Sequence, residues 1–357
     1  MPLVAHNNLP TFSRLSEEGH IVLSKNRALQ QDIRELHIGL LNMMPDAALS
    51  ATEKQFIGLI GNCNQIAQFY VYPFSLPELP RSKEALAHIH EHYFNFDDLQ
   101  KQGLDALIIS GANVANPMLE LEPFWAPLTE VVYWASKNVA STLCSCLATH
   151  ALVKQIYNID RRRLPQKKWG VYSHHICVPS HPILQNINTR FDVPHSRYND
   201  ISREQFESAG LRVLAESVDA GVHVASSPDY FSVIYFQGHP EYDVISLLKE
   251  YKRDVISFIN GTLEEQPPFP ENYFSKKGEE IANTFLTEAI HAKKRGDKIP
   301  DFPEKELLFD VDNTWGDTGK AIVNNWLGLV YGLTSLDRLG QYMEGVDPNN
   351  PLDIKIL

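Results

Sequence analysis

A histidine and a carboxylate stand two residues apart in the segment VIYFQGHPEYD, residues 233–243. The apolar run before them predicts a buried strand, so His239 and Glu241 follow directly on a strand end. Pro240 disfavours the helical conformation for His239, and in an extended segment residues i and i+2 project to the same side. A neighbouring carboxylate orients a histidine as a general base requires. The alternative is a partly buried histidine at a helix start, with Glu241 favourable at the helix N-terminus.

A nucleophile for such a pair is offered by Cys146, where the segment ASTLCSC gives way to a helical pattern. At a tight strand-to-helix junction a side chain is exposed above the sheet, and the helix N-terminus favours a thiolate. The backbone N–H of Leu147 can then help to stabilise an oxyanion. Two alternatives stay open: Cys146 is a small buried hydrophobe, or Cys144 is the nucleophile instead.

The elements that must position these residues alternate between short apolar runs and helix-length amphipathic stretches. This alternation predicts an α/β fold with a mostly parallel sheet flanked by helices. After about residue 169 the strands follow one another closely, which indicates antiparallel additions that lead back to a final core strand. We expect strands at 36–42, 65–74, 104–110 and 139–145, and helices at 50–63, 124–138, 243–261, 277–295 and 318–333.

We divide the chain into three parts on this pattern. Residues 1–35 form an N-terminal arm, residues 36–265 a catalytic domain, and residues 266–357 a C-terminal helical extension that packs on the catalytic domain. The Pro-rich piece at 266–274 could be a linker.

Composition narrows the class of protein. The 357 residues are 43% hydrophobic and 21% charged, which is typical of a globular protein. The net charge of −12 argues against nucleic acid or an anionic membrane as the main partner. Four irregularly spaced cysteines do not form a disulfide framework, and the first twenty residues do not read as a signal peptide. We therefore expect a cytoplasmic protein with small-molecule substrates and no nucleic-acid or membrane partner.

Several segments, in order, resemble the homoserine O-succinyltransferase family, whose fold is similar to class I glutamine amidotransferases (flavodoxin-like). They are RALQQDIRELHIGLLNMMP, FNFDDLQKQGLDALIISGAN, STLCSCLATHAL, GVYSHHI, PHSRYND, GHPEYD and NNWL. The resemblance runs from about residue 26 to 274 and resumes near Trp315. It implies that Cys146 is the acyl-thioester nucleophile, His239 the proton acceptor and Glu241 its partner.

The resemblance also implies substrate-binding positions. A substrate lysine falls on Lys167, the better match of the pair Lys167 and Lys168, and Ser196 in PHSRY matches a position that contacts the acceptor. Arg253 matches an arginine proposed to hold the carboxylate of the acceptor, although an exposed helix face explains it as well.

Acyl-donor choice in the family resembles a one-residue switch, with glycine accompanying succinyl-CoA and glutamate accompanying acetyl-CoA. The position is Ala115 here, and a small neutral side chain favours the succinyl donor. The strand-end amides near Gly111 and Ala112 are candidates for the second oxyanion donor.

The implied reaction moves a succinyl group from succinyl-CoA to the hydroxyl of L-homoserine through a Cys146 acyl-enzyme in ping-pong fashion. It would be the first committed step of methionine biosynthesis, carried out by a homodimer with succinyl-CoA as co-substrate and no cofactor or metal. The alternatives are an O-acetyltransferase or serine O-succinyltransferase with the same triad, a glutamine amidotransferase-type hydrolase, and a non-catalytic binding protein.

Some segments depart from the family or offer other chemistry. The residues after MP are Asp46, Ala47 and Ala48, which suggests a longer loop without the lysines of the family. HIHEH (88–92) and SHHICVPSH (173–181) have histidines at spacings that could bind zinc, but a solvated face is the better interpretation. RRRLPQKK (161–168) is either a solvated turn or a site for the phosphates of coenzyme A. For the charged helix at 277–295 we have no functional account.

Overall fold

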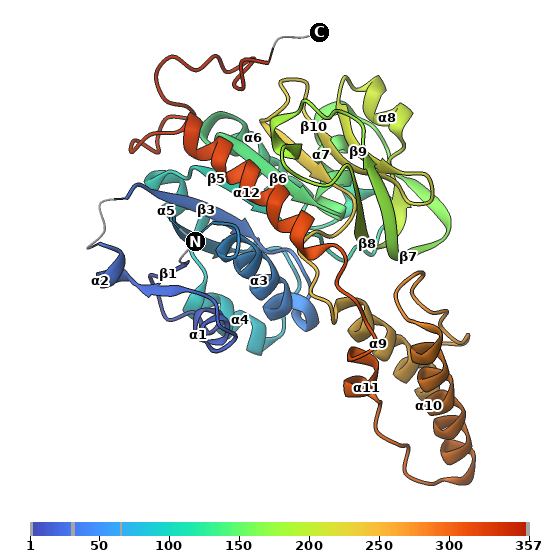
Figure 1. The fold of residues 1–357 in the computed structure, drawn as a ribbon. Helices are drawn as coiled ribbons and strands as arrows, with labels where there is room; N and C mark the ends of the chain where they lie inside the picture. The colour runs from blue at the N-terminus through green and yellow to red at the C-terminus, as the bar shows by residue number, and fades with distance from the viewer. Residues whose placement is uncertain (1–2, 30–32, 65, 355–357) are drawn as a thin grey trace.

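The computed structural model describes residues 3–29, 33–64 and 66–354 (Figure 1). The first residue of the expected strand 65–74 and parts of the N-terminal arm lie outside the described residues. Its centre is an 11-stranded sheet in the order β2-β1-β4-β3-β5-β6-β11-β10-β9-β7-β8. Neighbours from β2 to β11 pair in parallel, and those from β11 to β8 are antiparallel. The predicted α/β fold with antiparallel additions is confirmed.

The strands are β1 (Leu3–Ala5), β2 (Val22–Ser24), β3 (Glu35–Leu41), β4 (Gln68–Phe74), β5 (Ala106–Ile109), β6 (Ser141–Ser145), β7 (Arg162–Ile176), β8 (Arg190–Asp200), β9 (Arg212–Ser217), β10 (Gly221–Ser226) and β11 (Val233–Phe236). The α-helices are α1 (Pro10–Glu17), α2 (Lys25–Ala28), α3 (Asp46–Gly61), α4 (Lys83–His92), α5 (Phe96–Gln102), α6 (Trp125–Asn138), α7 (Leu147–Tyr157), α8 (Arg203–Ser208), α9 (Ser246–Asn260), α10 (Lys276–Arg295), α11 (Glu304–Leu308) and α12 (Gly316–Leu333). Two short 3-10 helices are η1 (Leu119–Leu121) and η2 (Pro182–Leu184).

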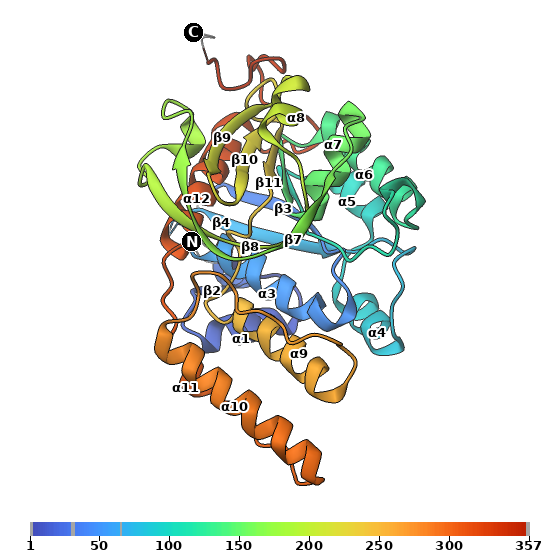
Figure 2. The same ribbon diagram turned by 90° about the vertical axis from the view of Figure 1, so that its right-hand side faces the viewer.

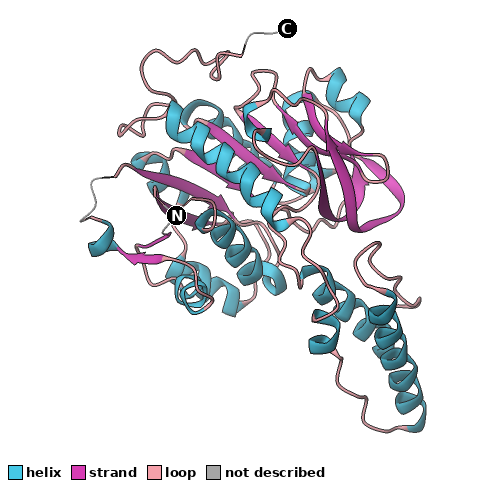
Figure 3. Ribbon diagram, viewed as in Figure 1, coloured by secondary structure: helices cyan, strands magenta, loops and turns pink. Residues whose placement is uncertain are grey.

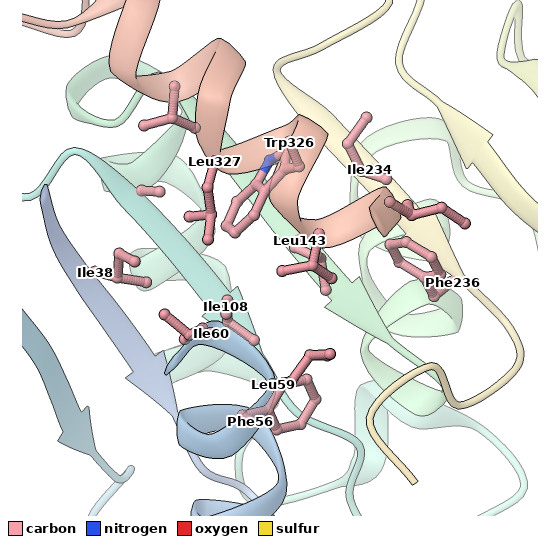
Figure 4. Close-up of a cluster of buried hydrophobic side chains, with 14 of the residues drawn as sticks. Ile38, Phe56, Leu59, Ile60, Ile108, Leu143, Ile234, Phe236, Trp326 and Leu327 are labelled. Carbon is pink, nitrogen blue, oxygen red and sulfur yellow. The ribbon is translucent and has the colours of Figure 1, made fainter. Parts of the chain in front are cut away.

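Helices cover both faces of the sheet, because the parallel strands are apolar on both sides (Figure 3). One face packs against α1, α3 and α12, and the other against α5, α6, α7 and α8. Figure 4 shows the first of these cores, where Trp326 and Leu327 of α12 lie over Leu143 of β6. The indole of Trp326 is fully buried and donates to Ser141 Oγ at 2.8 Å, so the last long helix is joined to the central strand.

Three local expectations are corrected. The segment after Pro45 is not a loop, because α3 begins at Asp46, whose carboxylate accepts from the backbone N–H of Ser82 at 2.7 Å. The basic segment from 162 onward is not a turn but the first part of β7. Its hairpin partner β8 was not expected, since its polar residues hide the strand pattern.

Helices α9, α10 and α11 form a smaller cluster beside the sheet, which Figure 2 shows below the body of the molecule. Their apolar residues pack with Trp169 and Val171 of β7, and a hydrogen bond of 2.8 Å from Glu271 N to Trp169 O fixes the Pro-rich segment to that strand. Within the described residues, no helix combines the length and apolar character that a membrane span requires. The domain boundaries at 35 and 265 stay predictions.

The start of α12 supports the turn that follows β11. Trp315 precedes the helix, and its indole donates to the carbonyl of Tyr242 at 2.8 Å. Gly319 lies so close to this turn that a Cβ atom built on it would be 2.9 Å from the carbonyl oxygen of Pro240. The helix can approach the 239–242 segment only because position 319 has no side chain.

We expect Gly319→Ala to destabilise the fold by about 1–3 kcal/mol, because the added methyl group must displace backbone at Pro240. Gly328→Ala is the matched control in the same helix, since a Cβ atom there meets nothing within 4 Å. It should raise stability by about 0.5–1 kcal/mol through the unfolded chain. Chemical denaturation of both variants measures the free energy of unfolding. Equal changes in the two variants would show that a side chain at position 319 is tolerated against Pro240.

Candidate active site

The carboxyl ends of the parallel strands β3, β5, β6 and β11 lie at one edge of the sheet, which is where open α/β sheets bind ligands. Strands β6 and β11 end level, because Ser145 pairs with Phe236. The backbone N–H of Cys146 donates to the carbonyl of Phe236 at 2.8 Å. This register brings the residue after β6 next to the segment that follows β11.

Cys146 is the single residue between β6 and α7, as the sequence predicted. Its backbone has φ 52° and ψ −110°, a region that costs a non-glycine residue about 1–3 kcal/mol. Such a strained turn raises a side chain above the sheet at the start of a helix. Cys144 is fully buried in the core, and burial raises the pKa of its thiol well above the ordinary value. The geometry therefore favours Cys146 over Cys144 as a nucleophile.

His239 and Glu241 are in contact, with 2.8 Å between His239 Nδ1 and Glu241 Oε1. The reason differs from the expectation, because the segment is not extended. It is a turn with Pro240 at its second position, in which Tyr242 N donates to His239 O at 3.3 Å. The Nε2 atom of His239 is buried and has no hydrogen-bond partner within the described residues. This nitrogen is therefore available for proton transfer.

A third side chain holds this pair, and sequence reasoning missed it. Ser145, the last residue of β6, donates from Oγ to Glu241 Oε1 at 3.0 Å. The carboxylate of Glu241 is thus fixed from β6 and from the turn after β11. The only feature of the sequence that could have indicated Ser145 is its position directly before Cys146.

The ionisation of His239 depends on its two neighbours. Burial alone would lower its pKa, but the charges of Glu241 and Cys146 outweigh burial and raise the pKa to about 10. A protonated imidazole beside a thiolate and a carboxylate is the arrangement that activates a cysteine nucleophile. His239 is therefore protonated and forms an ion pair with Glu241 beside Cys146.

A second polar group adjoins His239. The ring of Tyr242 stacks on that of His239, with 4.2 Å between the ring centroids. Its hydroxyl donates to Glu250 Oε1 at 2.9 Å, and Glu250 Oε2 accepts from Ser196 Oγ at 2.7 Å and Lys167 Nζ at 3.1 Å. The predicted positions Lys167 and Ser196 are thus brought together by Glu250, a residue that sequence reasoning missed.

The charge of Glu250 is fixed by these contacts. Burial would raise its pKa, but Lys167, Ser196 and Tyr242 lower it below the ordinary value. Arg253, one helical turn further along α9, is 65% exposed and donates from Nε to Asp254 at 2.8 Å. The structure places Arg253 beside this group without a hydrogen bond to it, so its role stays a prediction.

The loop after β5 lies on the other side of Cys146. A Cβ atom built on Gly111 would be 3.7 Å from the Cβ atom of Cys146, which places the Gly111 and Ala112 backbone beside the nucleophile. Further along, the N–H of Ala115 donates to Glu122 Oε1 at 2.8 Å. The amide of Leu147 is at the first position of α7, where backbone N–H groups lack helical partners. The oxyanion roles of Leu147 and Ala112 stay predictions.

The histidine clusters are engaged elsewhere. His88 Nε2 lies 3.0 Å from the buried Glu53 and so joins α4 to α3. In the segment 173–181, His175 and Cys177 approach Glu216 closely enough to share an ion. However, Arg203 donates to both the Cys177 sulfur, at 3.2 Å, and Glu216. A guanidinium in that place repels a cation.

Sequence comparison with known proteins gives one consistent description. Residues 2–336 match the sequence profile described as homoserine O-succinyltransferase. Proteins of that name from Thiothrix nivea and Methylobacter tundripaludum are 58% and 57% identical, over 99% of this chain and 99% and 100% of theirs. One from Cardiobacterium hominis is 52% identical over 99% of each chain.

Solved structures give weaker matches. A glutamine amidotransferase from Methylobacillus flagellatus is 11% identical with a TM-score of 0.45, over 85% of this chain and 96% of that one. Another from Thermotoga maritima is 12% identical with a TM-score of 0.43, over 83% of this chain and 98% of that one. These values have no bearing on the activity.

We expect the imidazole of His239 to stay protonated from pH 6 to 8, and Glu241→Gln and Cys146→Ala each to lower its pKa, because each removes a negative charge. Its folded pKa of about 10 exceeds the unfolded value of about 6.5. Its protonation therefore contributes stability that is fully present below about pH 6.5 and is lost as pH rises through about 10.

Nuclear magnetic resonance titration of histidine-labelled protein measures this pKa, with His239→Gln identifying the signal. Cys144→Ala is the matched control, because that thiol is buried in the core and is not among the groups that shift the pKa of His239. An imidazole of His239 that titrates near pH 6.5 in the wild type would refute the ion pair.

Proposed function

The chain belongs to the homoserine O-succinyltransferase family, as the resemblance predicted, and we propose that it transfers a succinyl group from succinyl-CoA to the hydroxyl of L-homoserine. One observation carries the proposal: the strained Cys146 lies at the strand end beside the buried pair of His239 and Glu241. The arrangement suits covalent acyl transfer, in which one difficult displacement is divided into two easier ones.

In the first step the Cys146 thiolate attacks the thioester carbonyl of succinyl-CoA. The amides of Leu147 and Ala112 are placed to stabilise the oxyanion. The carbon–sulfur bond to coenzyme A then breaks, and the leaving thiolate takes the proton of His239. The products are the succinyl-Cys146 thioester, free coenzyme A and a neutral imidazole.

In the second step the neutral imidazole acts as the base. Acylation removes the thiolate charge of Cys146, one of the two negative charges that raise the pKa of His239, so the ring holds its proton less strongly after coenzyme A leaves. His239 takes the proton of the homoserine hydroxyl, whose oxygen attacks the thioester and releases Cys146. Glu241 and Ser145 keep Nδ1 fixed throughout, so Nε2 does both transfers.

The polar group around Glu250 supports an amino-acid acceptor. Homoserine has an ammonium and a carboxylate at one end, and this group offers charges of both signs beside His239. We propose that Glu250 binds the ammonium, and that Lys167 and Arg253 bind the carboxylate, with Ser196 holding Glu250 in place. The hydroxyl of homoserine would then reach His239 past the ring of Tyr242.

The donor side supports a coenzyme A thioester. Arg162 and Arg163 are exposed at the start of β7, and Arg161 directly before them contacts the loop that contains Ala115. We propose that they bind the phosphates of coenzyme A, while the small side chain of Ala115 leaves room for the acyl group. From the family we further propose that the protein acts in methionine biosynthesis, is located in the cytoplasm and forms a homodimer.

The test is mass spectrometry of the intact protein after mixing with succinyl-CoA or acetyl-CoA. We expect a succinyl-sized mass gain that is lost in Cys146→Ala, kept in Cys144→Ala, and discharged by homoserine but not by serine. Discharge by serine would assign a serine acceptor, and labelling by acetyl-CoA alone an acetyltransferase. If neither donor labels the folded wild type while glutamine is hydrolysed to glutamate, the chain is an amidotransferase-type hydrolase.

The phosphate site has a separate test. Arg162→Gln and Arg163→Gln together should raise the KM for succinyl-CoA about tenfold or more, with little effect on kcat, because they remove ground-state contacts to phosphate. Succinyl-pantetheine, which lacks the nucleotide phosphates, should react equally with the wild type and the variant. An equal loss with both donors would contradict phosphate binding there.

A further inference from the structure

Arg161 immediately precedes β7, and its charge is incompletely satisfied. Its Nη2 donates to the carbonyls of Asn116 and Pro117 at 3.4 and 3.3 Å, which is long for such bonds. Its Nε is buried and has no partner, and within the described residues no carboxylate forms an ion pair with it. Arg161 is half-buried, and a guanidinium whose Nε is buried without a hydrogen-bond partner requires an explanation.

The nearest acid of the loop does not provide that partner. Glu122 Oε1 accepts from the backbone N–H groups of Ala115 and Asn116 at 2.8 and 2.6 Å, so it is committed to the shape of the loop. Burial lowers the pKa of Arg161, and the charges of Glu122 and Cys146 act against that shift. The guanidinium of Arg161 therefore interacts electrostatically both with the loop, through Glu122, and with Cys146.

Arg161 is on the donor side of Cys146. The loop begins at Gly111, beside the nucleophile, and reaches Arg161 at Asn116 and Pro117. The group around Glu250 lies on the other side, beyond His239. An acyl chain on Cys146 that extends away from the acceptor group therefore points toward Arg161.

We propose that Arg161 determines the acyl donor by binding the terminal carboxylate of the succinyl group, first on coenzyme A and then on Cys146. A guanidinium binds a carboxylate through two parallel hydrogen bonds. The Nε of Arg161 has no partner, and Nη2 has only the two long bonds to the loop carbonyls, which a carboxylate bound at this edge would replace. This role deepens the proposed function and rests on it. The proposed role of Arg161 differs from that of Arg162 and Arg163, which are exposed to solvent and are proposed to bind phosphates.

The test compares succinyl-CoA with acetyl-CoA, which lacks the carboxylate but has the same coenzyme. In Arg161→Gln the ratio of kcat/KM for the two donors should fall ~10- to 100-fold against the succinyl donor, the effect of losing charge-assisted hydrogen bonds. Arg162→Gln is the matched control and should change both donors by the same factor. Activity with acetyl-CoA also reports that the variant is folded.

A second measurement does not depend on turnover. In the Cys146→Ala background, Arg161→Gln should weaken binding of succinyl-CoA ~10- to 100-fold and leave binding of butyryl-CoA, the uncharged four-carbon analogue, unchanged. Equal effects on charged and uncharged donors would overturn the role of Arg161 and make it a brace for the loop. Failure of every acyl-CoA to label the wild type would instead count against the proposed function itself.

Discussion

The buried carboxylate of Glu241 is the interaction on which the rest of the site depends. One oxygen accepts from Ser145 at the end of β6 and from His239 after β11, so a single charge joins two strands that are distant in sequence. A carboxylate removed from water must be compensated, and it is compensated here by the imidazole of His239, which we propose transfers protons. The same contact sets the orientation, the charge and the position of His239 relative to Cys146.

Two segments flank Cys146 in this arrangement. Strand β6 lies between β5 and β11, so the loop after β5 borders the nucleophile on one side and the turn after β11 borders it on the other. The first side presents small residues and the cation of Arg161, and the second presents the mixed charges around Glu250. A donor and an acceptor can thus approach the same sulfur from different directions, which suits two successive half-reactions.

The sequence could predict the residues whose role is marked by local pattern. Cys146 stands at a strand-to-helix junction, and His239 and Glu241 follow a strand of obvious apolar character. By contrast, Glu250 acquires its role only when α9 packs against the β7–β8 hairpin, and Arg161 only when the loop after β5 folds onto it. Such contacts depend on the tertiary arrangement of distant segments, which no local periodicity encodes.

The support that α12 gives to the 239–242 turn has a consequence for how the protein is made. A chain growing on the ribosome that has reached residue 300 already contains Cys146, His239 and Glu241, but it lacks Trp315 and Gly319. The indole that holds the carbonyl of Tyr242 and the helix that packs on Pro240 are added only after these residues. The thiol of Cys146 is therefore present in the nascent chain well before His239 is held in place, and assembly of this site is linked to the synthesis of residues 315–319.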